Sequence, residues 1–449
     1  MHKYLRLLSD LEDLIQSHPY KEGDKLPSIR TLAQQYGCSI STVIRAMGEL
    51  EHRDMIYSMP KSGYYVVQRS RDKNQRAARI IDFASAAPDP DIFPYLDFRH
   101  CINKAIDAYR NDLFIYGTPQ GLASLIEVVR KQLTDYQVFA SQRNIFITSG
   151  VQQALSLLAT IPFPNGKKKI VIEQPCYHLF IEHLQTYNHD VIGVERTAAG
   201  INLQKLEHIF RTEDIKFFYT MPRFHNPLGT SYSAKEKRKI AVLAAKYDVY
   251  IVEDDYLADF EEDSRADPLY AYDDSSHVIY LKSYSKIIFP GLRVGIAVLP
   301  DTLTEVFNRY KRVADIDSSM LSQAALEIYI KSGMFERHKQ KIRTSYARKS
   351  KLLADALQQH IEQDGGIPAF DRLKNPYIHT HIVLDPKISV SSLASQLRQR
   401  SVLVDPAGKN YLAGHPQKKF LKLNASNVDE DNIEPGIRVI AEELRKAMK

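Results

Sequence analysis

Lys286 is the residue in this sequence whose surroundings most clearly suggest covalent chemistry. It lies between two runs, 278–281 and 293–299, that are β-branched, aromatic or apolar in the manner of strands buried in a sheet. A lysine in a loop after a strand can form a Schiff base with an aldehyde cofactor. The hydroxyls of Ser283 and Ser285, just before Lys286, and the cation of Arg293, seven residues after it, could hold a phosphate on that cofactor. The competing interpretation is a solvated surface lysine, because most lysines are exposed.

Further polar residues follow other apolar runs, at the points where strands are expected to end. Ser149 and Gly150 follow the run 145–148 and open a helical pattern, which is an arrangement that binds phosphate. The other members of the set follow later runs: Tyr177, Asn226, Asp254, Asp255 and Tyr256. Each alone has an ordinary explanation, such as a turn at Asn226 or a solvated acidic loop. The convergence of several loops on one sheet edge nevertheless predicts a binding site.

The apolar runs that must position these residues alternate with helical patterns. The expected strands are 145–148, 170–172, 191–194, 216–220, 249–252, 278–282 and 293–298. Strands that alternate with helices favour an α/β fold with a mostly parallel central sheet and helices on both faces. Ligands of such sheets bind beyond the carboxyl ends of the strands, which is where the candidate residues fall.

Composition places the chain among ordinary globular proteins. With 449 residues, 44% of them apolar, it is long enough for two or three domains. No run approaches about 18 consecutive apolar residues, so no membrane span is expected. Three scattered cysteines, Cys38, Cys101 and Cys176, indicate a reducing compartment and favour a cytoplasmic protein without a disulfide framework. Of the net charge of +6, residues 1–79 contribute +4 from 13 basic and 9 acidic side chains, which favours a negatively charged partner.

The first 68 residues have the pattern of a small helical domain with a two-stranded wing. Ser28 and Ser39 are the expected N-caps of two short helices, with a turn at Gly37 between them. Two short helices joined by a tight turn form a helix-turn-helix. Strand-like runs at 56–58 and 64–67 flank a basic turn that contains glycine, as in a wing.

A basic stretch separates this domain from the rest of the chain. Residues 68–79 contain no large apolar side chain and five Lys or Arg residues, so they cannot bury a core. We therefore expect a winged helix-turn-helix domain at 1–68, a flexible linker at 69–80 and a large domain at 81–449. Within the large domain, a small α+β subdomain is expected from about residue 335 onwards. The linker is long enough to reach a neighbouring subunit.

The N-terminal pattern resembles the winged helix-turn-helix of the GntR regulators. The motifs LPS-x-R-x-LA, ST-V-x-x-A-x-x-x-L and SG-x-x-V are matched within residues 26–66. The resemblance implies that double-stranded DNA is contacted by two helices and the wing, through Ser28, Arg30, Ser39, Ser41, Thr42, Arg45, Lys61, Ser62 and Gly63. Ile40 and Ile44 stand where relatives often carry a base-reading arginine, so readout is expected through thymine methyls or through Arg45. The alternative is a helical scaffold used only for protein contact.

The large domain resembles the fold-type I aminotransferases that use pyridoxal 5'-phosphate. The motifs SG-x-QQAL, E-x-P-x-Y, NP-x-G, EDDY, S-x-SK and GLR-x-G occur in that order across residues 81–447. The resemblance implies that Lys286 forms the internal aldimine and that Asp254 pairs with the pyridine nitrogen of the cofactor. Asp255 remains the alternative partner of that nitrogen, because spacing alone does not separate two adjacent carboxylates.

The resemblance also implies roles for the remaining candidates. Asn226 and Tyr256 would bond the ring hydroxyl of the cofactor, and Tyr177 would stack on its ring. Tyr116 would reach in from the second subunit of a homodimer. The phosphate would be held by Ser149, Gly150, Val151, Gln152, Ser283, Ser285 and Arg293.

Two residues depart from the pattern of the aminotransferases. Val151 stands where many relatives have Ser or Thr, so only its backbone amide could contact the phosphate. Lys422, in FLKLNAS, stands where relatives usually place an arginine that binds the carboxylate of the substrate. A lysine cannot form the planar bidentate pair that an arginine forms, so Lys422 is expected to bind an effector carboxylate less tightly.

A GntR-type domain joined to an aminotransferase-like domain is the plan of the MocR/GabR regulators. The resemblance implies a DNA-binding transcriptional regulator, homodimeric through the large domain, that senses an amino compound or B6 vitamer through the aldimine at Lys286. One alternative is an active aminotransferase with an accessory DNA-binding head. Another is a degenerate domain that serves only to dimerise.

Overall fold

The structure is a computed structural model that describes residues 3–16, 20, 24–52, 55–59, 62–66, 80–89, 92–263, 265–362 and 379–448. The chain divides into two compact units, Met1–Arg79 and Ile80–Lys449. The predicted linker at 69–80 lies outside the described residues except for its last residue, Ile80. Each unit has its own hydrophobic core, so each is described by itself.

The described part of the N-terminal unit packs helices against an antiparallel hairpin. Its elements are α1 (Lys3–Gln16), α2 (Ile29–Gln35), α3 (Ile40–His52), β1 (Ile56–Met59) and β2 (Gly63–Val66). Both predicted N-caps are confirmed, because the hydroxyls of Ser28 and Ser39 each accept a backbone amide hydrogen bond of 3.2 Å. Gly37 ends the first of these helices at a φ of 57°, which glycine adopts without a steric penalty.

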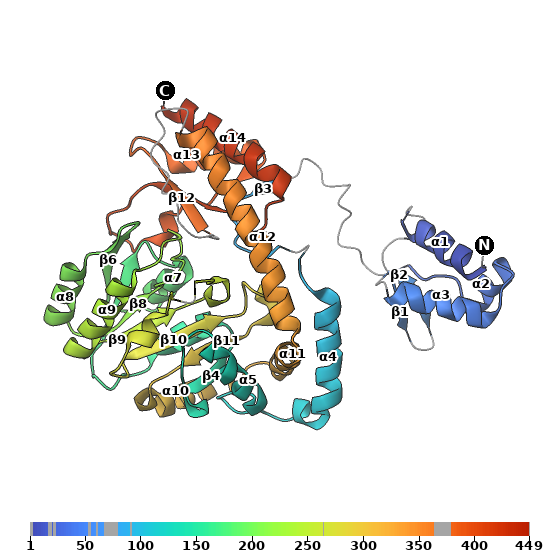
Figure 1. The fold of residues 1–449 in the computed structure, drawn as a ribbon, viewed down its shortest axis with the longest axis horizontal. Coiled ribbons are helices and arrows are strands. Elements are labelled where there is room, and N and C mark those ends of the chain that lie inside the picture. The colour runs from blue at the N-terminus through green and yellow to red at the C-terminus, as the bar shows by residue number, and fades with distance from the viewer. Residues whose placement is uncertain are drawn as a thin grey trace. The chain divides into compact units, whose positions relative to one another are not determined.

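The second unit is built on a mixed sheet with the strand order β4-β11-β10-β9-β8-β5-β6-β7 (Figure 1). The strands are β4 (Ile145–Thr148), β5 (Lys169–Gln174), β6 (Val191–Thr197), β7 (Gly200–Ile201), β8 (Ile215–Thr220), β9 (Tyr250–Asp254), β10 (Val278–Ser283) and β11 (Gly295–Val298). Strands β6, β5, β8, β9 and β10 are parallel neighbours, whereas β11 runs antiparallel to β10 and β4. The predicted α/β class with a mostly parallel sheet is confirmed.

Helices bury both faces of this sheet. In β8, Phe217 and Tyr219 belong to one hydrophobic cluster, whereas Phe218 between them belongs to another. Successive side chains of a strand point to opposite faces, so the two clusters are the two faces of the sheet. Helices of the unit are α4 (Tyr95–Tyr109), α5 (Ala123–Thr134), α6 (Val151–Thr160), α7 (His178–Thr186), α8 (Leu203–Thr212), α9 (Ala234–Tyr247), α10 (Asp301–Asp315) and α11 (Met320–Lys331). Short 3-10 helices lie at Arg110–Phe114, Gln142–Asn144, Ala258–Phe260, Leu269–Tyr272, Pro290–Leu292 and Gly408–Asn410.

A separate hydrophobic core marks the small α+β subdomain. Its elements are β3 (Ile81–Asp82), β12 (His379–Val383), α13 (Val390–Gln399), β13 (Val402–Leu403), β14 (Phe420–Asn424) and α14 (Glu430–Met448). The long helix α12 (Met334–Leu357) connects the two cores and continues as a π-helical turn, Gln358–Glu362 (Figure 1). Its first half packs in the large core through Ile342 and Tyr346, and its second half packs in the small core through Leu353 and Leu357.

Strand β11 begins two residues later than the sequence predicts. The reason is Arg293, whose φ of 55° takes it out of the strand conformation. Beyond it, β11 passes so close to the start of α6 that a Cβ atom on Gly295 would lie 2.7 Å from the carbonyl carbon of Gly150. Glycine at 295 is therefore required for the strand and the helix terminus to meet.

The described residues contain no disulfide, since Cys38, Cys101 and Cys176 are free thiols. Within the same described parts of the chain, no helix is both long and apolar enough to cross a membrane.

We predict that Gly295→Ala lowers the free energy of unfolding by about 1–3 kcal/mol, because the added methyl group must displace the backbone at Gly150. Chemical denaturation of the full chain, followed by circular dichroism, measures the change. Gly408→Ala is the matched control, because a Cβ atom there meets nothing within 4 Å. Equal stability of the two variants would contradict the prediction.

Candidate functional site

The predicted site residues gather at one edge of the central sheet. Ser149 follows β4, Tyr177 follows β5, Asn226 follows β8, and Asp254 ends β9. Lys286 lies in the loop just beyond β10. Because β5, β8, β9 and β10 are parallel, their carboxyl ends meet at this edge.

The amine of Lys286 is half-buried and donates a hydrogen bond to the backbone oxygen of Ala86. Burial, with a smaller contribution from the positive charge of Lys422, lowers the pKa of Lys286 to about 8. A lysine with such a pKa has an appreciable fraction of neutral amine near pH 7, which is the form that attacks a carbonyl group. The interpretation of Lys286 as an ordinary surface lysine is therefore wrong.

The geometry separates the two adjacent carboxylates at the end of β9. Asp255 accepts hydrogen bonds from Nε, at 3.0 Å, and Nη2 of the buried Arg223 side chain, and from the hydroxyl of Tyr280 at 2.8 Å. Asp254 receives one hydrogen bond, of 2.8 Å from Tyr219, to its Oδ2 atom. Its Oδ1 atom is buried and has no hydrogen-bond partner among the described residues. Asp254 therefore has a free acceptor position, whereas Asp255 is committed to Arg223.

The environment of Asp254 favours a cationic hydrogen-bond donor. Burial raises the pKa of Asp254 to about 7, and the charge of Asp255 adds to this increase, although the Tyr219 hydroxyl opposes it. A positively charged N–H group at Oδ1 would restore the ionised form and satisfy the orphaned oxygen.

Tyr177 and Tyr256 lie within electrostatic range of Asp254, and Asn226 follows β8 at the same edge of the sheet. Asn226 Oδ1 is buried and lacks a hydrogen-bond partner within the described parts of the chain. The Tyr256 hydroxyl donates to the backbone oxygen of Phe224 at 2.9 Å. Burial raises the pKa of Tyr177 to about 12, with a further increase from Asp254 and an opposing effect from Arg293. The Tyr177 ring is thus within electrostatic range of both of these charged groups.

The start of α6 and Arg293 form a seat for an anion. Gly150 precedes α6 at a φ of 81°, and no side chain caps the helix there. Arg293 donates to the backbone oxygen of Ser149 at 2.8 Å, and its guanidinium group lies over Gly150. Free amides of a first helical turn beside a guanidinium group are suited to a phosphate. The Val151 side chain is buried, so only its backbone amide is available, as the sequence indicates.

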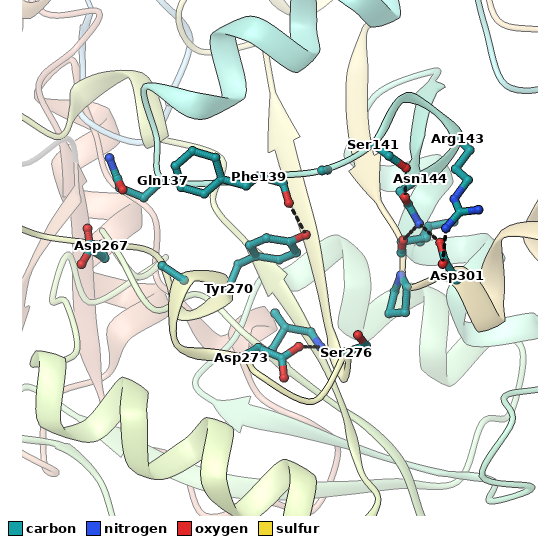
Figure 2. Close-up of a pocket in the computed structure, with 15 residues that line it drawn as sticks. Gln137, Phe139, Ser141, Arg143, Asn144, Asp267, Tyr270, Asp273, Ser276 and Asp301 are labelled. Atoms are coloured by element: carbon teal, nitrogen blue, oxygen red, sulfur yellow. Dashed lines mark hydrogen bonds and ion pairs between the residues drawn. The ribbon is translucent and has the colours of Figure 1, made fainter.

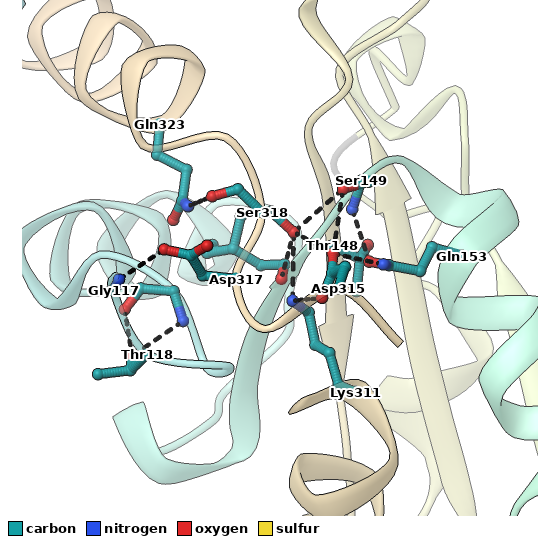
Figure 3. Close-up of polar contacts among 12 residues, drawn as sticks. Gly117, Thr118, Thr148, Ser149, Gln153, Lys311, Asp315, Asp317, Ser318 and Gln323 are labelled. Carbon is teal, nitrogen blue, oxygen red and sulfur yellow. Dashed lines mark hydrogen bonds and ion pairs between the residues drawn. The ribbon is translucent and has the colours of Figure 1, made fainter. Parts of the chain in front are cut away.

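The Ser149 hydroxyl contacts a polar cluster that the sequence did not reveal (Figure 3). It lies 3.3 Å from Asp315 Oδ2 and 3.3 Å from Ser318 Oγ, while Gln153 accepts the Ser149 amide at 2.8 Å. The buried Lys311 amine donates to Asp315 at 3.1 Å. The cluster therefore ties Ser149, just before α6, to the C-terminal end of α10 and to Ser318, which follows it.

The same cluster extends to the loop that carries Tyr116. Asp317 accepts the amide of Gly117 at 2.6 Å (Figure 3). Ile316, between Asp315 and Asp317, has a φ of 56°, which is a strained conformation for a β-branched residue. The backbone amide of Asp317 donates a hydrogen bond across it to the backbone oxygen of Asp315. Tyr116 itself is 79% exposed, so it contributes nothing to the cluster of its own chain.

The remaining phosphate candidates lie near this seat with different degrees of exposure. Ser283 is buried and its hydroxyl accepts the Ser285 amide at 3.1 Å. The Ser285 side chain is half-buried. Gln152 donates to the backbone oxygen of Leu179 at 3.4 Å, and its buried Oε1 atom has no partner in the described structure.

Lys422 is buried on β14 and faces Asp405 across an ion pair of 3.9 Å, which is too long for a direct hydrogen bond. Burial lowers the pKa of Lys422 to about 8, assisted by Lys409 and opposed by Asp405. Lys422 affects the pKa values of both Lys286 and His379, so these side chains share one electrostatic environment. The sequence analysis did not identify His379 as a site residue. The signal was the run His-Thr-His at 379–381, in which two polar side chains alternate on one side of a short strand.

The candidate DNA-binding residues of the N-terminal unit lie mainly on its surface. Ile40 and Ile44 on α3 are 50% and 49% exposed, which is unusual for isoleucine and leaves them available for thymine methyl groups. Arg45 stacks on Tyr4, with its guanidinium carbon 5.0 Å from the ring centre. Exposed or partly exposed candidates also include Ser28, Arg30, Ser39, Ser41, Thr42, Ser62 and Gly63. Lys61 lies outside the described residues.

A cavity of about 610 Å³ lies at the opposite edge of the sheet (Figure 2). It opens where β10 begins and β11 ends, and its wall includes Phe139 and Tyr270, whose hydroxyl donates to the Phe139 backbone oxygen at 3.3 Å. Arg143 pairs there with Asp301 at 2.6 Å. None of the predicted site residues lines this cavity, so it is distinct from the candidate site.

Comparison with known proteins gives two family matches. Residues 3–66 match the bacterial regulatory proteins of the gntR family, and residues 78–440 match aminotransferase class I and II. An uncharacterized HTH-type transcriptional regulator of Bacillus subtilis (strain 168), YcxD, is 57% identical over 444 residues, covering 99% of this chain and 100% of the relative. The aromatic-amino-acid aminotransferase 1 of Thermococcus litoralis is 26% identical over 385 residues, covering 82% of this chain and 89% of that protein.

Solved structures share the fold of the second unit. The kynurenine aminotransferase of Pyrococcus horikoshii matches with a TM-score of 0.75 and 26% identity, covering 90% of this chain and 99% of that chain. A multiple substrate aminotransferase from Thermococcus profundus matches with a TM-score of 0.75 and 24% identity, covering 85% of this chain and 96% of that chain.

We predict that Asp254→Asn and Asp255→Asn have different effects. Asp254→Asn should leave the stability of the apo-protein within about 1 kcal/mol and weaken binding of added pyridoxal phosphate about tenfold or more, because an amide cannot neutralise a cationic ring nitrogen. Asp255→Asn should lower the free energy of unfolding by about 3–5 kcal/mol, because Arg223 is left buried without its counter-charge. Denaturation and absorbance titration of both variants measure the two effects, and exchanged phenotypes would refute the assignment.

Proposed function

Since the chain belongs to the family of HTH-type transcriptional regulators in which a GntR-type domain precedes an aminotransferase class I and II domain, as in MocR/GabR regulators, we propose that its response to an effector depends on pyridoxal 5'-phosphate bound at Lys286. The family supplies the regulatory role and the fold. The residues of the candidate site supply the argument for the cofactor.

The observation that carries the proposal is a pair of buried oxygens without partners at the same sheet edge as a lysine of lowered pKa. Asp254 Oδ1 and Asn226 Oδ1 have no hydrogen-bond partner in the described structure, and each such group costs roughly 1–3 kcal/mol when buried. A pyridinium N–H group would satisfy the first oxygen, and a hydroxyl on the same ring would satisfy the second. The donor set of the site therefore fits pyridoxal phosphate.

When bound, pyridoxal phosphate supplies an aldehyde that combines with amines and a ring that withdraws electrons from them. Lys286 would be the point of covalent attachment, Asp254 would hold the ring nitrogen, and Tyr177 would contact the ring. Asn226 and Tyr256 hold the ring hydroxyl. The phosphate would be held by Ser149, Gly150, Val151, Gln152, Ser283, Ser285 and Arg293, with the contribution of Val151 limited to its backbone amide.

The effector is an amino compound or a B6 vitamer. An amine can combine with the aldehyde in place of Lys286, and a vitamer can supply the aldehyde itself. Lys422 offers a buried cation for a carboxylate on such an effector. Effector binding changes the packing of the small subdomain, since Lys422 lies on β14 of that subdomain while Lys286 belongs to the large core. We propose that the predicted linker at 69–80 transmits this change to the DNA-binding unit.

The DNA partner is a double-stranded operator, recognised by α3 and the wing. The exposed hydroxyls and Arg30 contact phosphates, while Ile40 and Ile44 contact bases. Operator binding places the protein in the cytoplasm. The protein acts as a homodimer through the large domain, in which the exposed Tyr116 contacts the cofactor site of the second subunit, and the length of the linker also permits domain swapping.

A second candidate function is aminotransferase turnover with an accessory DNA-binding head. The similarity to aminotransferases over most of the chain favours it, and a half-buried lysine with a pKa of about 8 can carry a proton. A half-reaction assay with a panel of amino acids separates the two functions. Rapid release of a keto acid favours the enzyme, whereas binding without release favours the sensor.

We predict that Lys286→Ala abolishes the visible absorbance of the bound cofactor and the response of DNA binding to effector. Binding of the apo-protein to operator DNA should remain within about threefold of the wild type, because the DNA-binding unit has its own core. Absorbance spectra and electrophoretic mobility shifts measure the two properties. Lys351→Ala, at an exposed position of α12, is the control. Loss of DNA binding in Lys286→Ala would contradict the division of roles.

We predict that Arg30→Ala weakens DNA binding on all sequences by a similar factor and reduces the slope of log affinity against log salt by about 1, as expected for the loss of one phosphate contact. Fluorescence anisotropy at several salt concentrations measures the slope. Arg6→Ala is the control, since Arg6 forms an ion pair with Asp10 on α1. An unchanged slope would remove Arg30 from the interface.

A further inference from the structure

His379 is a buried histidine whose hydrogen bonding defines its protonation. It begins β12, is 1% exposed, and faces Asn424 of β14 in the strand register. The Asn424 side chain lies 3.2 Å from His379 Nδ1. The other end of the Asn424 amide, Oδ1, accepts the backbone amide of Ser426 at 2.8 Å and the Ser426 hydroxyl at 2.6 Å.

These contacts determine the tautomer of His379. Because Asn424 Oδ1 accepts from the Ser426 amide, the NH2 group of Asn424 must point toward His379. An NH2 group only donates, so His379 Nδ1 is the acceptor and the ring proton is on Nε2. Burial lowers the pKa of His379 well below its usual value, with further decreases from Lys422, Lys286 and His225, so the ring is neutral at pH 7.

The Nε2–H group of His379 is consequently a hydrogen-bond donor for which the described residues provide no acceptor. Nε2 is buried and has no hydrogen-bond partner among the residues that the structure describes. A buried donor without a partner lowers the stability of the folded protein. A ligand atom that accepts a hydrogen bond from Nε2 would remove this cost.

The position of His379 places this donor in the candidate site. Its ring centre is 6.3 Å from that of Tyr256. The hydroxyl oxygen of Ser426, which shares its one proton between Asn424 Oδ1 and the backbone oxygen of Ala87, lies 2.9 Å from the latter, next to Ala86, which accepts from Lys286. Lys286 and Lys422 both act electrostatically on His379, so a ligand atom at Nε2 also lies in a positive field.

We propose that His379 determines effector specificity by donating its Nε2–H group, oriented through Asn424, to an anionic oxygen of the effector that Lys422 also attracts. This inference rests on the proposed function, because it assumes that the effector binds at Lys286. It narrows the effector to amines that carry a carboxylate or phosphate group, and it excludes plain amines as strong effectors. Asn424 is a positioning residue, since it acts only through the histidine.

The tautomer is tested first, on the full-length apo-protein. Nitrogen-15 spectra of histidine-labelled protein, with His379 assigned by comparison with His379→Gln, should show Nε2 protonated and Nδ1 unprotonated near pH 7. In Asn424→Asp, the carboxylate presents an acceptor to Nδ1, so the proton should move there or the ring should become charged. A wild-type spectrum with protonated Nδ1 would overturn the proposal.

The specificity is tested by absorbance titration of the cofactor-loaded protein. The probes are amino acids, the amine that each becomes without its α-carboxylate, and O-phosphoethanolamine for a phosphate group. His379→Phe should weaken binding of the carboxylate-bearing or the phosphate-bearing probes about tenfold or more, while plain amines change less than about threefold. The class of probe that responds identifies the anion. His379→Gln should retain most of the affinity, because its amide NH2 can reach the same oxygen.

A matched control is His183→Phe, since His183 on α7 also has a buried Nε2 without a partner in the described structure but packs against Phe180 and Tyr187. It should behave as the wild type. Equal weakening of amino acids and plain amines in His379→Phe, or no weakening, would overturn the role of His379. A wild-type protein that shows no cofactor absorbance at all would instead overturn the proposed function, so the two failures are distinguishable.

Discussion

The burial of several carboxylates at one edge of the central sheet is the constraint on which the site depends. Glu173 at β5 is fully buried and accepts hydrogen bonds from Arg196 at 2.8 Å, Thr220 at 2.9 Å and the Met221 amide at 3.1 Å. Although burial opposes ionisation, Arg196 and the other partners hold the pKa of Glu173 at about 2. Because a buried charge without a partner costs several kcal/mol, these contacts fix the ends of β5, β6 and β8 relative to one another. The loops that carry the site residues start from these fixed points.

Asp254 differs from the other buried carboxylates because no neighbouring cation among the described residues keeps it ionised. Asp255 has Arg223, and Asp259 has Lys282, whereas Asp254 has only the neutral hydroxyl of Tyr219. With a pKa near 7, its carboxyl group is ionised fully only when a cation arrives. A cationic hydrogen-bond donor bound at Oδ1 of Asp254 would therefore gain an ionised and fully bonded carboxylate. The same reasoning applies to His379, a donor that folding leaves without an acceptor.

Features that depend on neighbouring residues could be predicted from the sequence, whereas features that depend on distant partners could not. Ser28 and Ser39 were identifiable as N-caps because a cap bonds to an amide three residues away. The choice between Asp254 and Asp255 required Arg223, which is 32 residues away from Asp255 in the chain. The direction of the Ser149 hydroxyl depends on Asp315, and the tautomer of His379 depends on Asn424. The order of motifs along the chain predicted the fold because each motif follows a strand, but it carried no information about which acceptors remain free.

The positive charges of the site explain why an anionic effector could change the packing of the small subdomain. Lys422 lowers the pKa of Lys286, so the two amines repel each other, and Asp405 pairs with Lys422 only at 3.9 Å. That distance leaves the ion pair weaker than a hydrogen-bonded one. An effector carboxylate can therefore approach Lys422 without first breaking a short contact, and it reduces the repulsion at the same time. Lys422, Asp405 and Asn424 all belong to the small subdomain, so an anion bound as proposed would contact that subdomain and Lys286 together and would link occupancy of the site to the arrangement of the two cores.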